Sequence, residues 1–72
     1  MMNKKLTLTL HECEDILRSY GIRCSARGIA AGFESGVYPF GRIKGVGRTG
    51  RRETEIFRAD LEKWLREKGA EL

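Results

Sequence analysis

Residues 38–57 read YPFGRIKGVGRTGRRETEIF, and the rest of the chain is arranged around this stretch. Pro39 and four glycines interrupt it, and short apolar runs stand on either side of a middle rich in glycine and arginine. Glycine adopts the turn conformations that a tight connection needs, whereas β-branched and aromatic residues favour strands. The pattern predicts two short strands joined by a glycine-containing loop, which is a β-hairpin.

Positive charge is concentrated in this hairpin. From Gly41 to Arg52 the chain has five basic residues and no acidic residue. If the strands pair around Ile43 and Ile56, these two residues cover the helices, and the basic residues at 42 and 44 lie near the two glutamates of the second strand. The arginines at 48, 51 and 52 then have no acid opposite them. A hairpin with a positive tip is suited to a phosphate backbone.

Length and composition indicate one small packed domain that spans residues 1–72, with residues 1–5 disordered and residues 69–72 forming a tail. The chain has 72 residues, 40% of them hydrophobic, and six aromatic side chains. Its formal net charge is +4 and its pI is about 9.4. A core of this size contributes about 3–5 kcal/mol of net stability, and the basic balance favours a polyanionic partner.

Two cysteines, Cys13 and Cys24, indicate the cellular compartment. No secretory signal precedes them, so we expect reduced, buried thiols in a cytoplasmic protein. Residues 1–5 are followed by only a few apolar residues before charged residues resume. This pattern predicts neither a signal peptide nor a membrane span.

The first helix is predicted to begin after Thr9. The Thr9 hydroxyl is expected to cap the helix, and the Glu12 carboxylate to accept a hydrogen bond from the Thr9 amide. Gly21 ends it. Residues 6–8 either add a short strand or hold the N-terminus against the core. The apolar face of this helix consists of residues at helical spacing, namely Leu10, Cys13, Ile16, Leu17 and Tyr20.

A second helix is predicted from Ala26 to Ser35, with Ser25 as its N-cap and Gly36 as its stop. Gly28 and Gly32 inside it each cost about 1 kcal/mol relative to alanine, so we expect close packing or a close approach to its backbone. Its core face consists of Ala26, Ile29, Ala30 and Phe33. A turn of about four residues separates the two helices, which makes them a helix-turn-helix.

The third helix is predicted to span residues 58–68, with Gly69 as its stop. Leu61, Trp64 and Leu65 form its apolar face. Acidic residues fall in its first turn and basic residues in its last turn, as the helix dipole favours. Trp64 is expected to be the largest single side chain in the core.

These features together resemble a known family. The matching residues are Ser25 at the start of the second helix, Gly36, Pro39, the glycine- and arginine-rich hairpin, and the run Asp60-Leu61-Glu62-Lys63-Trp64-Leu65. The chain resembles the excisionase family of phages and transposons, which are winged helix-turn-helix proteins related to the DNA-binding domain of MerR-type regulators. The resemblance implies an α+β fold, mainly α, with three helices and a β-hairpin wing between the second and third.

In that family the second helix enters the major groove, and the wing touches the backbone or the adjacent minor groove. The resemblance implies that residues 25–27 open the reading helix, and that Gly28, Ala31 and Gly32 lie on or beside its groove-facing side. Small residues at 28, 30 and 31 leave few side chains for base readout, so phosphate contacts and DNA shape must supply more of the binding. The predicted DNA contacts are Arg23, Ser25, Arg27, Gly28, Ala31, Arg42, Lys44, Arg48, Thr49, Arg51 and Arg52.

The predicted function is an accessory factor that binds double-stranded DNA for site-specific recombination of a mobile element. Its expected partners are double-stranded DNA and, beside it, either a site-specific recombinase or further copies of the chain on DNA. A small phage-type transcriptional regulator is the alternative, followed by a protein-interaction module on the same fold and by an RNA-binding protein. We expect no catalytic residue and no cofactor. We also expect no metal site, since His11 and Cys13 point to different helix faces and cannot bind one metal ion together. The glycines at 45, 47 and 50 lack the following helix of a dinucleotide site.

Overall fold

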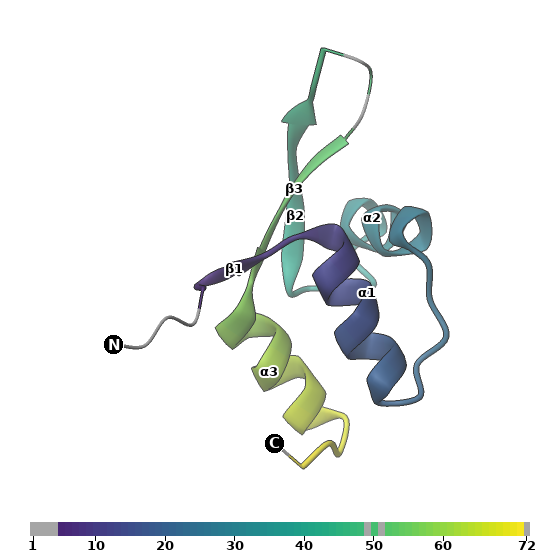
Figure 1. The fold of residues 1–72 in the computed structure, drawn as a ribbon, viewed down its shortest axis with the longest axis vertical. Helices are drawn as coiled ribbons and strands as arrows, with labels where there is room; N and C mark the ends of the chain where they lie inside the picture. The colour runs from purple at the N-terminus through teal and green to yellow at the C-terminus, as the bar shows by residue number, and fades with distance from the viewer. Residues whose placement is uncertain (1–4, 49, 51, 72) are drawn as a thin grey trace.

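The computed structural model describes residues 5–48, 50 and 52–71, and of Arg52 it describes the backbone. Within these residues the chain forms three helices and a three-stranded antiparallel sheet, an α+β fold (Figure 1). In chain order the elements are β1 (Thr7–Leu8), α1 (Leu10–Ser19), α2 (Ala26–Ser35), β2 (Gly41–Val46), β3 (Arg52–Phe57) and α3 (Arg58–Glu67).

The sheet has the strand order β1-β3-β2. The order of helices and strands along the chain differs from the predicted one, because a strand stands before α1. β1 precedes the three helices and the hairpin, and it is the short strand that the sequence left open as one of two alternatives for residues 6–8. Thr7 lies opposite Phe57, and Leu8 lies opposite Ile56. The Arg58 amide also donates to the Leu6 carbonyl at 2.8 Å. β1 forms because β3 has a free edge there, and pairing buries Leu8 to 6% exposure.

Local signals place the helix ends. The Thr9 side chain accepts from the Glu12 amide at 3.0 Å, and the Glu12 carboxylate accepts from the Thr9 amide at 2.9 Å. This is the predicted capping box. Gly36 ends α2 with φ 83°, a conformation that favours glycine. The predicted bounds of α2 are confirmed, and α3 ends one residue earlier than predicted, with Lys68 as its C-cap.

Both ends of the chain contact the fold next to the described limits. The Lys5 ammonium lies 3.0 Å from the Glu12 carboxylate. After α3, the Ala70 amide donates to the Leu65 carbonyl at 2.9 Å. Lys5 and Ala70 therefore contact α1 and α3. The rest of the predicted disordered start, residues 1–4, and the last residue of the predicted tail lie outside the described residues.

The hairpin pairs β2 with β3, and its far end extends past the helices (Figure 1). Ile43 lies opposite Thr54 and Ile56 lies opposite Gly41, so the two isoleucines are not directly paired. Both nevertheless contact the core, because they lie on the same face of the sheet. The register shifts between Ile43 and Gly45, which makes Lys44 the extra residue of a bulge.

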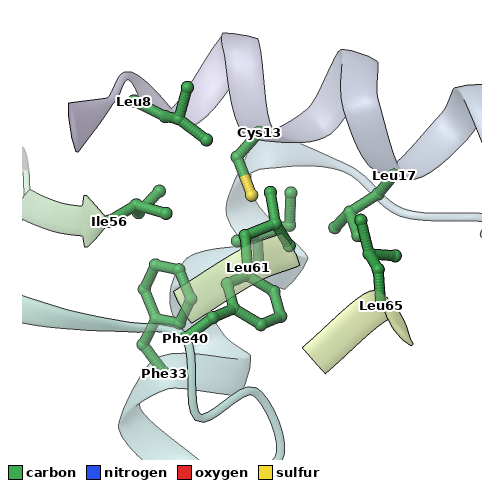
Figure 2. Packing of buried hydrophobic residues seen from close by; sticks show 9 residues of the cluster. Leu8, Cys13, Leu17, Phe33, Phe40, Ile56, Leu61 and Leu65 are labelled. Carbon is green, nitrogen blue, oxygen red and sulfur yellow. The ribbon is translucent and has the colours of Figure 1, made fainter. Parts of the chain in front are cut away.

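One hydrophobic cluster lies between the helices and one face of the sheet (Figure 2). Every described helix and strand except β2 contributes a buried member, and half-buried Ile43 of β2 packs against the cluster. Its buried members are Leu8, Cys13, Leu17, Ile29, Phe33, Phe40, Ile56, Leu61 and Leu65.

Phe40 is the largest fully buried side chain, so the prediction that Trp64 fills the core is wrong. Phe40 is 1% exposed, and its ring lies 5.5 Å from the Phe33 ring in an edge-to-face arrangement. Trp64 is half-buried and packs 5.1 Å from the Phe40 ring. Phe40 enters the core from the segment before β2, and this leaves Trp64 at the rim.

No helix in the described part of the chain is long and apolar enough to cross a membrane.

Candidate nucleic-acid interface

The start of α2 is fixed by Ser25. Its side chain accepts from the Gly28 amide at 3.1 Å, and its carbonyl accepts from the Ile29 amide at 2.9 Å. The remaining amides of the first turn point out of the helix and carry its partial positive charge. Arg27 is exposed in this turn. The first turn of α2 therefore presents positive charge from both its backbone and a side chain.

The exposed face of α2 contains few long side chains. Ile29, Ala30 and Phe33 are buried on the opposite face, as predicted. Gly32 is also buried, because the Tyr38 ring lies against it, so the expectation that it sits on or beside the groove-facing side is wrong. The exposed residues recur at helical spacing and are Arg27, Gly28, Ala31, Glu34 and Ser35.

Two arginines beside the turn before α2, one at the end of α1 and one in the turn itself, have different surroundings. Arg18 donates from Nε and Nη2 to the Cys24 carbonyl at 3.2 and 3.0 Å, and its Nη2 lies 3.0 Å from the Glu14 carboxylate. Arg18 thus ties the turn to α1. Arg23 is exposed and forms no ion pair or hydrogen bond with any described residue. Arg23 remains available to a ligand beside the start of α2.

Arg42 is engaged within the hairpin. Its Nε donates to Oε1 of Glu55 at 2.7 Å, and Nη2 lies 2.7 Å from the same oxygen. The predicted pairing of Arg42 with a glutamate of the second strand is confirmed. Lys44, at the bulge, is exposed and forms no ion pair within the described residues, so its predicted neutralisation is wrong. The bulge breaks the direct opposition that a regular register would give.

The two faces of the hairpin carry different residues. Gly41 and Ile43 face α2, since a β-carbon on Gly41 would lie 2.5 Å from the Phe33 ring and Ile43 packs against the core. Arg42 and Lys44 alternate with them and are exposed. Successive side chains of a strand point to opposite faces. The structure therefore places these two basic residues away from α2, and not beside it.

The predicted contacts at the hairpin tip are only partly described. Arg48 is exposed and forms no ion pair within the described residues. The Arg52 backbone lies opposite Val46 in the sheet. Thr49, Arg51 and the Arg52 side chain lie outside the described residues.

Comparisons with protein-family models, with curated proteins and with solved structures found no match to this chain.

Two titratable groups of α1, outside α2 and the hairpin, have shifted pKa values. Burial raises the pKa of the Cys13 thiol to about 12, with a smaller contribution from the Cys24 thiol. The hydrogen bond from the Thr9 amide, followed by the Lys5 side chain, lowers the pKa of Glu12. Both cysteines are free thiols. Within the described residues, no three His, Cys, Asp or Glu side chains are placed to hold a metal ion.

Tyr38 positions the candidate site, although no sequence pattern pointed to it. Its ring lies against Gly32, and its amide donates to the Gly32 carbonyl at 3.1 Å. The ring also packs edge-to-face on Trp64 at 5.7 Å. Gly32 inside a helix was the one available signal, because a buried helical glycine marks a close approach.

Proposed function

We propose that this chain binds double-stranded DNA as a winged helix-turn-helix, with α2 in the major groove and the hairpin on the backbone or in the adjacent minor groove. One observation supports this proposal above the others. The described arginine side chains fall into two groups. Arg18, Arg42, Arg58 and Arg66 each contact a carboxylate or a carbonyl of the fold.

The other described arginines are Arg23, Arg27 and Arg48, which form no such contact. All three are among the residues that the sequence assigned to DNA. Exposed arginines without a protein partner are the side chains that phosphate oxygens bind best, because the guanidinium offers several donors in one plane. The sorting of the arginines therefore favours a polyanionic ligand at the turn, the first turn of α2 and the hairpin.

The exposed face of α2 limits how such a protein reads sequence. Gly28 and Ala31 offer no hydrogen-bonding side chain to a base edge, whereas Arg27 does. Phosphate contacts and the shape of the duplex then supply most of the affinity. Arg42 contributes less than its charge implies, because Glu55 neutralises it.

The proposed role is that of an accessory factor in site-specific recombination, as the resemblance to excisionases suggests. A recombinase and further copies of the chain on DNA are the proposed partners. A small transcriptional regulator uses the same DNA contacts. The two roles differ in one measurement: an accessory factor changes the ratio of excision to integration when it is added to a purified recombinase encoded beside its gene.

DNA binding itself is tested by titrating a labelled duplex with protein at several salt concentrations. With four to six phosphate contacts, log K is expected to fall with log salt at a slope of about −4 to −5. Arg27→Ala is expected to lower the ratio of the affinity for a selected site to the affinity for random DNA. The matched control is Arg66→Ala, which removes the same charge from an exposed arginine of α3 paired with Glu62.

Arg66→Ala is expected to leave that ratio unchanged. The absence of binding even at low salt would refute the proposal. An equal change of this affinity ratio in both variants would show that only the net charge affects binding, and that α2 does not read bases.

A further inference from the structure

The exposed face of α2 has a small side chain at its centre. Successive residues of a helix are rotated by about 100°, so the exposed positions from Arg27 to Ser35 form one sector with Ala31 near its middle. Gly28 lies in the same sector, one turn before Ala31. Arg27 and Glu34 lie along one margin of it. A surface that meets α2 here can therefore come close to the helix backbone beside Ala31.

The two glycines of α2 have different surroundings. A β-carbon on Gly32 would overlap the Tyr38 ring, so packing within the fold accounts for this glycine. A β-carbon on Gly28 would meet only the Ser25 hydroxyl, at 3.3 Å, among the described atoms. The side chain of Ala31 is exposed. Within the described structure, the outer side of α2 is thus open at positions 28 and 31, where a ligand can reach the backbone of the helix.

Arg27 and Ala31 present two different chemical groups from one side of α2. They are four positions apart, which is about 6 Å along the helix axis. Arg27 is exposed and forms no ion pair or hydrogen bond with any described residue. In the major groove of DNA, a guanidinium donates two hydrogen bonds to O6 and N7 of guanine, and the apolar group that meets an alanine methyl is the 5-methyl group of thymine. The two side chains therefore match two particular bases.

We propose that the first two turns of α2 read a guanine through Arg27 and the 5-methyl group of a thymine through Ala31. Such reading rests on the proposed binding of α2 in the major groove, and it names the bases that this helix selects. The absence of a side chain at Gly28 lets the helix approach closely enough for the short Ala31 side chain to reach a base edge. Adjacent bases are about 3.4 Å apart, so the guanine and the thymine are expected within about three base pairs of each other.

Deoxyuridine in place of thymidine tests the Ala31 contact, because it removes only the 5-methyl group. Duplexes enriched from a random pool by the full-length protein define the site. Deoxyuridine is then placed at each thymine in turn, and one position is expected to lose affinity about two- to fourfold. Ala31→Gly is expected to bind the two duplexes equally, since it has no methyl group to lose the contact.

The matched control is Ala59→Gly, which makes the same substitution at an exposed alanine of α3. It lowers helix propensity in the same way, and it should retain the preference for thymine over deoxyuridine. Circular dichroism melting checks that each variant folds, and the wild-type comparison of thymine with deoxyuridine needs no variant.

The Arg27 contact is tested in the same way with 7-deazaguanine, which lacks the N7 acceptor. At the selected guanine it is expected to weaken binding of the wild type about fivefold. In Arg27→Ala it should have no further effect, because the donor is already absent. A 7-deazaguanine effect that persists in Arg27→Ala would assign the guanine to another side chain.

The outcomes separate this reading from DNA binding itself. If no duplex is bound even at low salt, the proposed function fails and the reading of bases fails with it. If duplexes bind but no sequence is enriched, or if deoxyuridine weakens binding at no position, DNA binding stands and the reading through Ala31 is overturned. An equal deoxyuridine effect in wild type and Ala31→Gly would overturn it as well.

Discussion

The ring of Tyr38 lies directly against the backbone of Gly32, so that a β-carbon at position 32 would overlap ring atom Cδ2. The Tyr38 amide also donates to the Gly32 carbonyl, and this folds the segment after α2 back onto its last turns. In a second close contact, the Phe33 ring of α2 occupies the space where a β-carbon of Gly41 in β2 would lie. These two glycines let α2 and the hairpin approach closely, and they fix the position of the candidate recognition helix relative to β2.

Gly32→Ala is expected to destabilise the fold by about 2 kcal/mol, because overpacking forces the Tyr38 ring to move. Urea unfolding followed by circular dichroism measures this. The control is Gly28→Ala in the same helix, where the added β-carbon meets only the Ser25 hydroxyl at 3.3 Å. Its gain in helix propensity offsets that contact, and the net change should stay below about 1 kcal/mol. A Gly32→Ala protein as stable as the wild type would show that the contact with Tyr38 is loose.

Phe40→Ala is expected to unfold the domain. Removing a fully buried phenylalanine costs about 3–5 kcal/mol, which equals the net stability of about 3–5 kcal/mol that a core of this size contributes. Trp64→Ala is expected to cost less, because Trp64 is half-buried at the rim. Circular dichroism melting of the two variants compares them. A Trp64→Ala protein that is less stable than Phe40→Ala would contradict this ranking.

Stability is expected to fall at alkaline pH through Cys13. Burial raises its pKa from 9.0 to about 12, so between these values the unfolded chain loses the thiol proton and the folded chain keeps it. The contribution of this group is therefore present below about pH 9 and is lost as the pH rises, by up to about 1.4 kcal/mol per pH unit.

Urea midpoints at about pH 8 and about pH 10.5 measure this loss. Cys13→Ala should reduce the loss, and Cys24→Ala should retain it, because Cys24 is only half-buried. An unchanged loss in Cys13→Ala would assign the pH dependence to other groups.

The hairpin allows the contributions of unpaired and paired basic residues to DNA binding to be compared. Lys44→Ala with Arg48→Ala is expected to weaken binding to every duplex and to flatten the salt slope by about one unit per lost phosphate contact. Arg42→Ala is expected to change the slope by less than that, because the Glu55 carboxylate already holds the Arg42 guanidinium at 2.7 Å. The measurement is the same salt titration of a labelled duplex. A larger effect of Arg42→Ala would show that the ion pair opens on DNA.

The ends of the helices were determined by the sequence itself. Thr9 and Glu12 form the predicted capping box, Ser25 caps α2, and Gly36 ends it. Each signal acts within three or four residues along the chain, so the neighbouring sequence is sufficient to specify it. The hairpin and the third helix were predictable for the same reason, because turn residues and helical periodicity are local patterns.

Only the tertiary structure decided which residues fill the core and which charges stay unpaired. Phe40, not Trp64, is the largest fully buried side chain, because the segment before β2 packs its ring against Phe33 of α2 and Trp64 of α3. Arg58 donates to the carbonyl of Lys5, 53 residues away in sequence, at 3.1 Å. Arg42 pairs with Glu55, whereas the bulge leaves Lys44 unpaired. These outcomes depend on strand register and on contacts between distant segments, which no short stretch of sequence specifies.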